Sequence, residues 1–132
     1  GWGHVSTFGG AEVGCRVAQK VLEITTRPEV VGNAARVADL IGGGLRELQR
    51  RYADWLVEVR ARGLVMGLKF AHGEGALLMA KALYDSGLWA MFAAYDRSVL
   101  QFNPGLLLDE KTCIEILERF ETGIRRCLAG LR

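Results

Sequence analysis

Histidine, cysteine and lysine are scarce in this chain of 132 residues. The low numbers of histidine and cysteine argue against a metal site and against a disulfide framework. Two histidines and three cysteines, with no closely spaced cysteine pair, do not form the ligand pattern of a zinc site. The odd number of cysteines also argues against a disulfide framework, so a reducing, cytoplasmic setting is expected. We therefore predict no metal site and no disulfide.

Long apolar runs and blocks of like charge are also missing. No stretch approaches the roughly 20 apolar residues that span a bilayer, and no signal peptide is visible. The 17 basic and 15 acidic residues are interspersed, which argues against nucleic-acid or membrane binding through a basic patch. Half of the residues are hydrophobic and 24% are charged, a balance typical of one globular domain.

Hydrophobic periodicity predicts a mixture of helices and short strands. Pro28 suits the first turn of a helix, and Asp109 suits an N-cap. We expect helices over residues 11–24, 28–52, 76–86 and 109–131, and strands over residues 56–60, 64–70, 88–94 and 99–102. The predicted fold class is α+β: a small, largely antiparallel sheet with helices packed on one side.

Three consecutive glycines, Gly42 to Gly44, interrupt the second predicted helix. Each glycine costs about 1 kcal/mol relative to alanine inside a helix, so the run predicts either a kink or a site of close packing. We favour close packing. Cys15, Cys113 and Cys127 fall within predicted helices and are expected to be small core residues.

The strongest candidate for chemistry is the segment His-Val-Ser-Thr-Phe-Gly-Gly at residues 4–10, directly before the first predicted helix. Backbone N–H groups and the helix dipole favour a phosphate at such a position. The hydroxyls of Ser6 and Thr7 can donate hydrogen bonds to phosphate oxygens. From spacing alone, the alternative is a turn that Ser6 or Thr7 merely initiates.

Three segments, in order along the chain, resemble the class III aminotransferases, which include ornithine, acetylornithine and putrescine aminotransferases. Residues 4–15 resemble the family's H-x-S-T-F-G-G-x-x-x-x-C segment. Residues 59–68 resemble its R-G-x-G-L-M-x-G strand pair, and residues 100–108 resemble the R-F-x-P-P-L segment before the last helix. The resemblance implies the C-terminal part of a type I transferase fold that depends on pyridoxal 5′-phosphate (PLP).

The resemblance also implies a homodimer with shared active sites. Thr7 would reach the phosphate of the PLP held by the other subunit, with Ser6 beside it. Residues 1–27 would be the cofactor-phosphate loop and a bridging helix from the large domain, and residues 28–132 the C-terminal small domain.

Gln101 stands where the family usually has an arginine near a substrate carboxylate. Glutamine cannot form a bidentate charged pair, so an amine, or a substrate carried on something larger, is favoured over a carboxylate at this spot. The alternative is an ordinary exposed residue of a strand.

The family's cofactor-carrying lysine lies upstream of the S-T-F segment, and neither Lys20 nor Lys69 matches its context. We expect part of a transaminase that moves an amino group between a primary amine or amino acid and a 2-oxo acid. The isolated chain, with no catalytic residue of its own, is expected to be inactive. The alternatives are a non-catalytic dimerisation or partner-binding domain and a phosphate-binding module.

Overall fold

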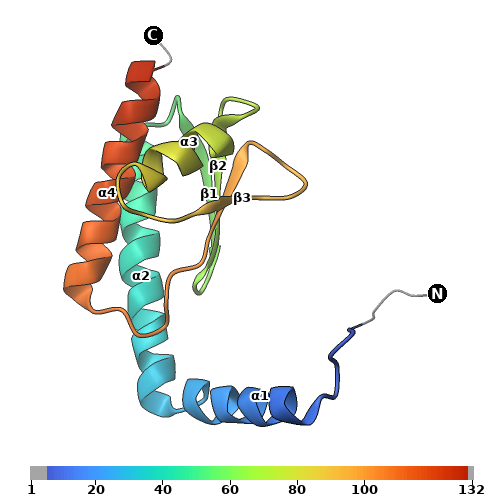
Figure 1. Cartoon of the computed structure of the whole chain (residues 1–132). Helices are drawn as coiled ribbons and strands as arrows, with labels where there is room; N and C mark the ends of the chain where they lie inside the picture. The colour runs from blue at the N-terminus through green and yellow to red at the C-terminus, as the bar shows by residue number, and fades with distance from the viewer. Residues whose placement is uncertain (1–5, 131–132) are drawn as a thin grey trace.

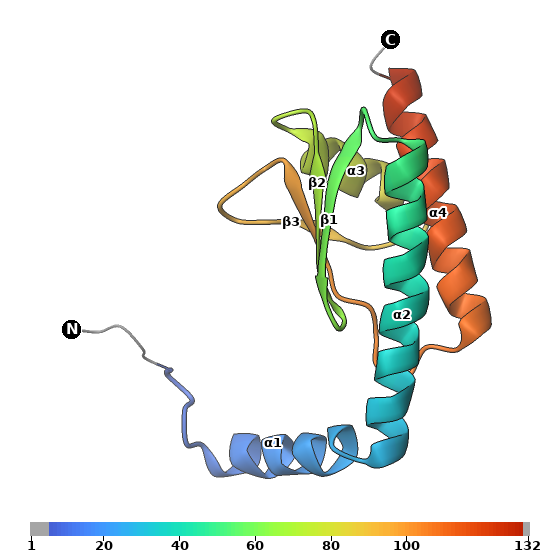
Figure 2. The same ribbon diagram turned by 180° about the vertical axis from the view of Figure 1, so that it is seen from behind.

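A four-stranded antiparallel sheet with three helices on one of its faces forms the body of the chain (Figures 1 and 2). The computed structural model describes residues 6–130, so His4 and Leu131 lie outside the described residues. The predicted α+β class, with its helices on one side of the sheet, is confirmed. In chain order the elements are α1 (Glu12–Thr25), α2 (Pro28–Arg51), β1 (Leu56–Arg62), β2 (Val65–Phe70), α3 (Gly75–Tyr84), β3 (Met91–Phe92), β4 (Val99–Phe102) and α4 (Glu110–Gly130).

Helix α1 projects from the end of α2 as an arm, away from the sheet (Figure 1). Its apolar residues recur at helical spacing, yet Val13, Val17 and Val21 are 78%, 58% and 50% exposed. Cys15 lies on this arm and is exposed, so the expectation that it is a core residue was wrong. The amphipathic pattern correctly predicted a helix, but it did not say whether the body of this chain covers the apolar face.

Helices α2 and α4 pack closely against each other at Gly44. A Cβ atom added at Gly44 would overlap the methyl groups of Leu117 on α4, whereas one added at Gly43 would meet open space. Helix α2 runs without a break from Pro28 to Arg51. Close packing, the favoured interpretation of the glycine run, therefore holds at Gly44.

The strand order in the sheet is β1-β2-β4-β3, and all three pairings are antiparallel. The hairpin between β1 and β2 turns at Gly63, whose φ of +58° is a conformation that glycine adopts without strain. The buried strand predicted over residues 88–94 was wrong in extent and burial, because the strand covers only Met91 and Phe92, which are 49% and 39% exposed. As the edge strand, β3 has a neighbour on one side only.

The core lies between the helices and the inner face of the sheet. Phe102 of β4 and Phe120 of α4 meet edge to face, with ring centroids 4.9 Å apart. Cys113 and Cys127 are buried in this layer, as predicted. None of the described helices is long and apolar enough to cross a membrane.

Polar contacts that the sequence suggested in part anchor α4 at its N-terminus and near its middle. Asp109 caps the helix, since its Oδ1 accepts a hydrogen bond from the N–H of Thr112 at 2.8 Å. Further along α4, Oε1 of Glu121 accepts hydrogen bonds from Arg51 and Tyr52 near the end of α2, at 2.8 and 2.9 Å, and from Arg125, at 2.6 Å. This network joins α4 to α2.

The Glu121 network predicts a pH-dependent contribution to stability. Burial alone would raise the pKa of Glu121, but the hydrogen bonds from Tyr52, Arg125 and Arg51 outweigh it, and the pKa is lowered from its ordinary value of 4.5. A carboxylate with a lowered pKa stabilises the fold above the unfolded-state pKa, and this contribution is lost as pH falls through the folded-state pKa. Glu121→Gln should therefore reduce stability at pH 7, and its difference from wild type should narrow towards pH 3.

Urea unfolding at pH 7, 5, 4 and 3 tests this expectation. Glu115→Gln is the matched control, because Glu115 lies on the same helix and pairs with Arg119 but is half exposed. Exposed ion pairs contribute little, so this control should stay close to wild type at every pH. A difference between Glu121→Gln and wild type that does not change with pH would contradict the role assigned to the carboxylate.

Candidate functional site

The segment before α1 forms a tight turn that presents two hydroxyl groups to solvent. The N–H of Gly9 donates to the carbonyl of Ser6 at 3.2 Å, and Ser6 and Thr7 are both exposed. Gly10 follows with a φ of +83°, a conformation that other residues rarely adopt. A Cβ atom at Gly9 would lie 3.1 Å from Cβ of Ser6, so both glycines have a structural reason to be there.

Helix α1 begins directly after this turn with its first N–H groups open to a ligand. Its N-cap, Ala11, makes no side-chain hydrogen bond to them. The free N–H groups of a helix N-terminus bind anions. Glu12 lies in the same first turn, so an anion here would be held by hydrogen bonds rather than by net positive charge.

The second candidate residue, Gln101, lies on the open face of the sheet, opposite the helices. It is exposed and pairs with Gly67 of β2 on one side and Met91 of β3 on the other. Gly67 in turn pairs with Arg60 of β1. Because residues directly paired in an antiparallel sheet project from the same face, these four residues form one row across the open face.

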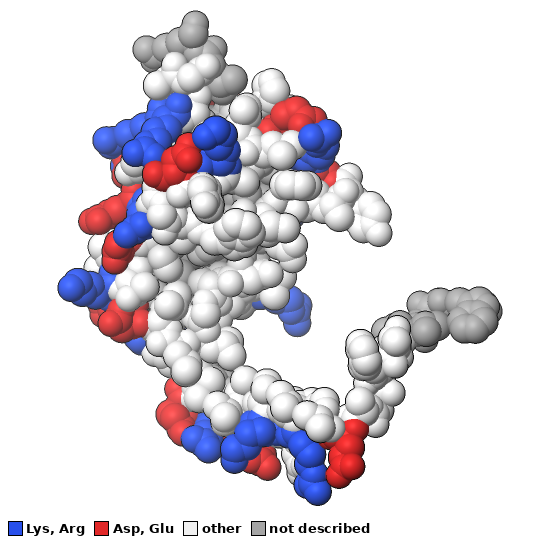
Figure 3. All heavy atoms as spheres, viewed as in Figure 1, with Lys and Arg blue, Asp and Glu red and all other residues white. Residues whose placement is uncertain are grey.

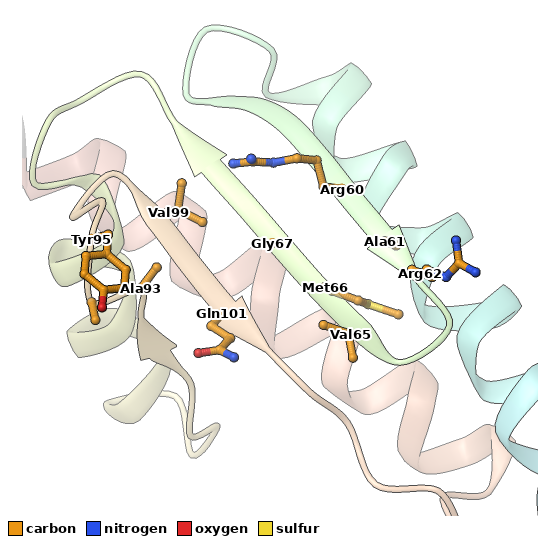
Figure 4. A pocket seen from close by; sticks show the side chains of 11 residues that line it. Arg60, Ala61, Arg62, Val65, Met66, Gly67, Ala93, Tyr95, Val99 and Gln101 are labelled. Carbon is orange, nitrogen blue, oxygen red and sulfur yellow. The ribbon is translucent and has the colours of Figure 1, made fainter. Parts of the chain in front are cut away.

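A hollow of about 630 Å³ covers the middle of this row (Figure 4). Its lining includes Arg60, Gly67, Val99, Tyr95 and Gln101. In Figure 4, Arg60 extends from β1 across β2, on the same side of the sheet as Gln101. The hollow therefore combines two cations, Arg60 and Arg62, with an amide and a phenol, and its floor has no side chain at Gly67.

Arg60, like Arg62 and Tyr95, lines this hollow but was given no role by the sequence analysis. The residue falls inside the segment that matched the family's strand pair, but no role was assigned to it. The alternation of Glu58, Arg60 and Arg62 along one strand would have predicted a polar face. Only the register of β1 on β2 and of β2 on β4 brings Arg60 into the row of Gln101.

All four lysines of the chain lie on its surface. Lys20, Lys69 and Lys81 have carboxylate oxygens at 2.8, 3.9 and 2.8 Å from Nζ, and Lys111 is exposed. A lysine that carries a cofactor needs an enclosed site where its charge is suppressed. These lysines have no such surroundings. Within residues 6–130, no three His, Cys, Asp or Glu side chains are grouped to hold a metal ion.

The two candidate regions lie on different parts of the chain. The turn with Ser6 and Thr7 directly precedes α1, whereas Gln101 is on β4 of the sheet, and both ribbon views show α1 projecting away from the sheet (Figures 1 and 2). The charged side chains of α1 gather on the side of the arm turned away from the body, and the side facing the body is largely uncharged (Figure 3). The structure thus brings Gln101 together with Arg60, but not with Ser6 or Thr7.

Comparison with protein families and curated proteins gives a consistent picture. The model of the family "Aminotransferase class-III" matches residues 2–124. An uncharacterized aminotransferase of Archaeoglobus fulgidus is 41% identical over 116 residues, which cover 88% of this chain and 27% of that protein. An acetylornithine aminotransferase of Rhodobacter capsulatus is 32% identical over 118 residues, covering 89% of this chain and 29% of that protein.

Solved structures show the same fold. The chain matches an acetylornithine aminotransferase from Elizabethkingia anophelis with a TM-score of 0.79 at 23% identity, covering 93% of this chain and 32% of that one. It matches an N-acetylornithine aminotransferase from Stenotrophomonas maltophilia with a TM-score of 0.76 at 25% identity, covering 86% and 31%. The chain therefore spans less than a third of the length of these relatives.

Proposed function

The chain belongs to the class-III aminotransferase family, and from this membership we propose that it is one part of a PLP-dependent transaminase. The proposed reaction moves an amino group between a primary amine or amino acid and a 2-oxo acid. The observation that carries the proposal is the family match over residues 2–124 of 132. Because the relatives are more than three times as long, we assign the activity to a longer polypeptide that contains this chain.

Ser6 and Thr7 fit the phosphate group of PLP. Both residues are exposed, and they stand next to a helix N-terminus whose N-cap residue, Ala11, makes no side-chain hydrogen bond to the helix. Two hydroxyl donors and the backbone N–H groups of α1 would hold the phosphate oxygens. PLP, when bound, withdraws electrons from the carbon that bears the amino group. In the homodimer that we propose, Ser6 and Thr7 serve the cofactor of the partner subunit.

Gln101 would present its amide to the substrate from the wall of the hollow. The side-chain amide donates hydrogen bonds from its NH2 group and accepts them at its oxygen, but it carries no charge. At this position a neutral or amino group of the substrate is therefore favoured over a carboxylate.

The isolated chain should not catalyse the reaction. Its four lysines are on the surface, three of them with carboxylates nearby, and none has the enclosed surroundings that make a lysine nucleophilic. The catalytic lysine that we expect is in the remainder of the longer polypeptide.

Removal of the Thr7 hydroxyl should weaken cofactor binding by the full-length polypeptide. A hydrogen bond to a charged group contributes about 1.5–3 kcal/mol, so Thr7→Ala should raise the Kd for PLP roughly tenfold to a hundredfold. The Kd is measured by titrating apoprotein with PLP and recording visible absorbance. Thr122→Ala is the control, because Thr122 is exposed on α4 and its hydroxyl donates a hydrogen bond to the Glu118 carbonyl of its own helix.

One observation favours a second candidate function, a dimerisation or partner-binding domain. The arm exposes an apolar stripe together with Phe8, which is 84% exposed, and such patches mark interaction surfaces. The PLP titration separates the two candidates. If the wild-type full-length polypeptide binds no PLP, the transaminase function is excluded and the dimerisation or partner-binding function is favoured.

A further inference from the structure

The residues that follow α3 border Gln101 from the neighbouring strand. Ala93 lines the hollow together with Gln101 (Figure 4). Trp89 and Met91 line a smaller hollow of about 230 Å³, which Gln101 also borders. The position of residues 88–95 therefore sets the width of the space into which Gln101 would present its amide.

The strand inside this segment, β3, is weakly held by its own contacts. It pairs with β4 along one edge, at Met91 and Phe92. The side chain of Trp89, just before it, is 70% exposed. A strand of two residues with one neighbour and little buried surface belongs to the least stable parts of a fold. Its position therefore depends on where the chain leaves α3.

The chain leaves α3 through a closed turn at Gly87. The N–H of Gly87 donates to the Tyr84 carbonyl and the N–H of Leu88 to the Leu83 carbonyl, both at 2.9 Å. The φ of Gly87 is +75°. These two hydrogen bonds and a glycine in the left-handed region form a Schellman motif, which ends the helix and sets the direction of the next residues.

Arg119 of α4 closes this turn from the outside. Its Nη1 donates to the carbonyl of Ser86 at 2.7 Å, and its Nε and Nη2 donate to Oε1 of Glu115 at 3.1 and 2.5 Å. The guanidinium occupies the place of the missing side chain of Gly87, because a Cβ atom there would overlap Nη1. A cation at the C-terminal end of a helix also interacts favourably with the helix dipole. Arg119 thus joins α4 to the turn from which β3 starts.

A second arginine of α4 contacts the same helix end without reaching the turn. Nη1 of Arg126 donates to the carbonyl of Asp85 at 2.9 Å and to Oγ of Ser86 at 3.1 Å. These contacts support α3, whereas the contact at Gly87 belongs to Arg119. Arg126 is therefore a matched control of the same residue type on the same helix.

We propose that Arg119 is a positioning residue for the substrate, because it fixes the turn at Gly87 and, through that turn, the strand β3 beside Gln101. This inference rests on the proposed transaminase function and adds to it a residue from the helical side of the sheet. Without Arg119 the start of residues 88–95 is free to move, and the space next to Gln101 varies in width. The substrate then binds less tightly, while the chemical step, which depends on the remainder of the longer polypeptide, is unchanged.

Steady-state kinetics of the full-length polypeptide test the role in substrate binding. The acceptor is 2-oxoglutarate, and the varied donor is whichever of n-butylamine, putrescine and ornithine wild type uses fastest. Arg119→Gln should raise the KM for the donor about tenfold and leave kcat within about twofold. Arg119→Lys keeps a charged donor for the Ser86 carbonyl and should recover most of the loss. Arg126→Gln should leave KM within about twofold of wild type.

Hydrogen–deuterium exchange tests the anchor without any activity measurement. Peptides covering residues 88–95 should exchange about fivefold faster or more in Arg119→Gln, whereas those of the hairpin between β1 and β2 should match wild type. Gly87→Ala should have the same effect, since its methyl group would displace Arg119. Because both changes break one contact, the double variant should exchange no faster than the more affected single variant.

The outcomes separate this inference from the proposed function. If wild type transaminates and Arg119→Gln keeps its KM, or if Arg126→Gln raises KM as much, the role of Arg119 is overturned and the transaminase stands. Unchanged exchange of residues 88–95 in Arg119→Gln would overturn the anchor, whatever the kinetics. If wild type does not transaminate, the proposed function is overturned, and the exchange result decides by itself whether Arg119 anchors β3.

Discussion

Phe120→Ala should lower the free energy of unfolding by about 3–5 kcal/mol, the loss typical of a large aromatic residue removed from a core. Phe120 is 1% exposed and is one of the largest fully buried side chains of the chain. It meets Phe102 edge to face, so its removal also deletes an aromatic pair that joins α4 to the sheet. The cavity would open in the core, between α4 and the inner face of the sheet. The hollow with Gln101 lies on the opposite face of the same sheet.

Urea unfolding followed by tryptophan fluorescence measures this loss. Ile114→Ala is the matched control, because Ile114 lies on the same helix and is 49% exposed. Substitutions on the surface usually stay within about 0.5 kcal/mol of wild type. A loss below about 1 kcal/mol in Phe120→Ala would mean that α4 does not pack on the sheet as described.

Gly44→Ala should destabilise the chain by about 1–3 kcal/mol, although alanine is the better helix former. The added methyl group would overlap the side chain of Leu117 on α4, and the two helices would have to move apart. Gly43→Ala, one position earlier, should instead stabilise by up to about 1 kcal/mol, since its methyl group meets open space. Two adjacent glycines in one helix should therefore respond with opposite signs.

A double-mutant cycle with Leu117→Ala identifies the cause. If the overlap with Leu117 is responsible, Gly44→Ala and Leu117→Ala combined should cost less than the sum of the two single changes. Thermal or urea unfolding of the four proteins gives the coupling energy. Additive losses would place the strain elsewhere in α2.

The local features of the fold were predictable from residue type and spacing. The apolar periodicity of α2 and α4, the N-cap Asp109 and the turn at Gly63 each depend on residues within about four positions of one another. The same spacing identified α1 as a helix but placed Cys15 wrongly in a core. Amphipathicity shows that a face is apolar, not which part of a protein covers it.

The strand predicted over residues 88–94 failed for a related reason. Its apolar composition suits a buried central strand, and a short apolar run does not reveal its place in a sheet. The order β1-β2-β4-β3 puts Met91 and Phe92 at the edge, where only β4 pairs with them. The burial of these residues depended on strand order, which the local pattern does not contain.

For the candidate site, the sequence by itself determined that the hydroxyls of Ser6 and Thr7 precede a helix and that Gln101 is uncharged. It also provided the family resemblance from which the expected roles of these residues come. Only the tertiary structure decided that Arg60 shares a row with Gln101 and that the apolar face of α1 stays uncovered by the body. The physical reason is the range of the interactions. Helix periodicity and caps are set by near neighbours in sequence, whereas register, strand order and burial are set by contacts between residues far apart in sequence.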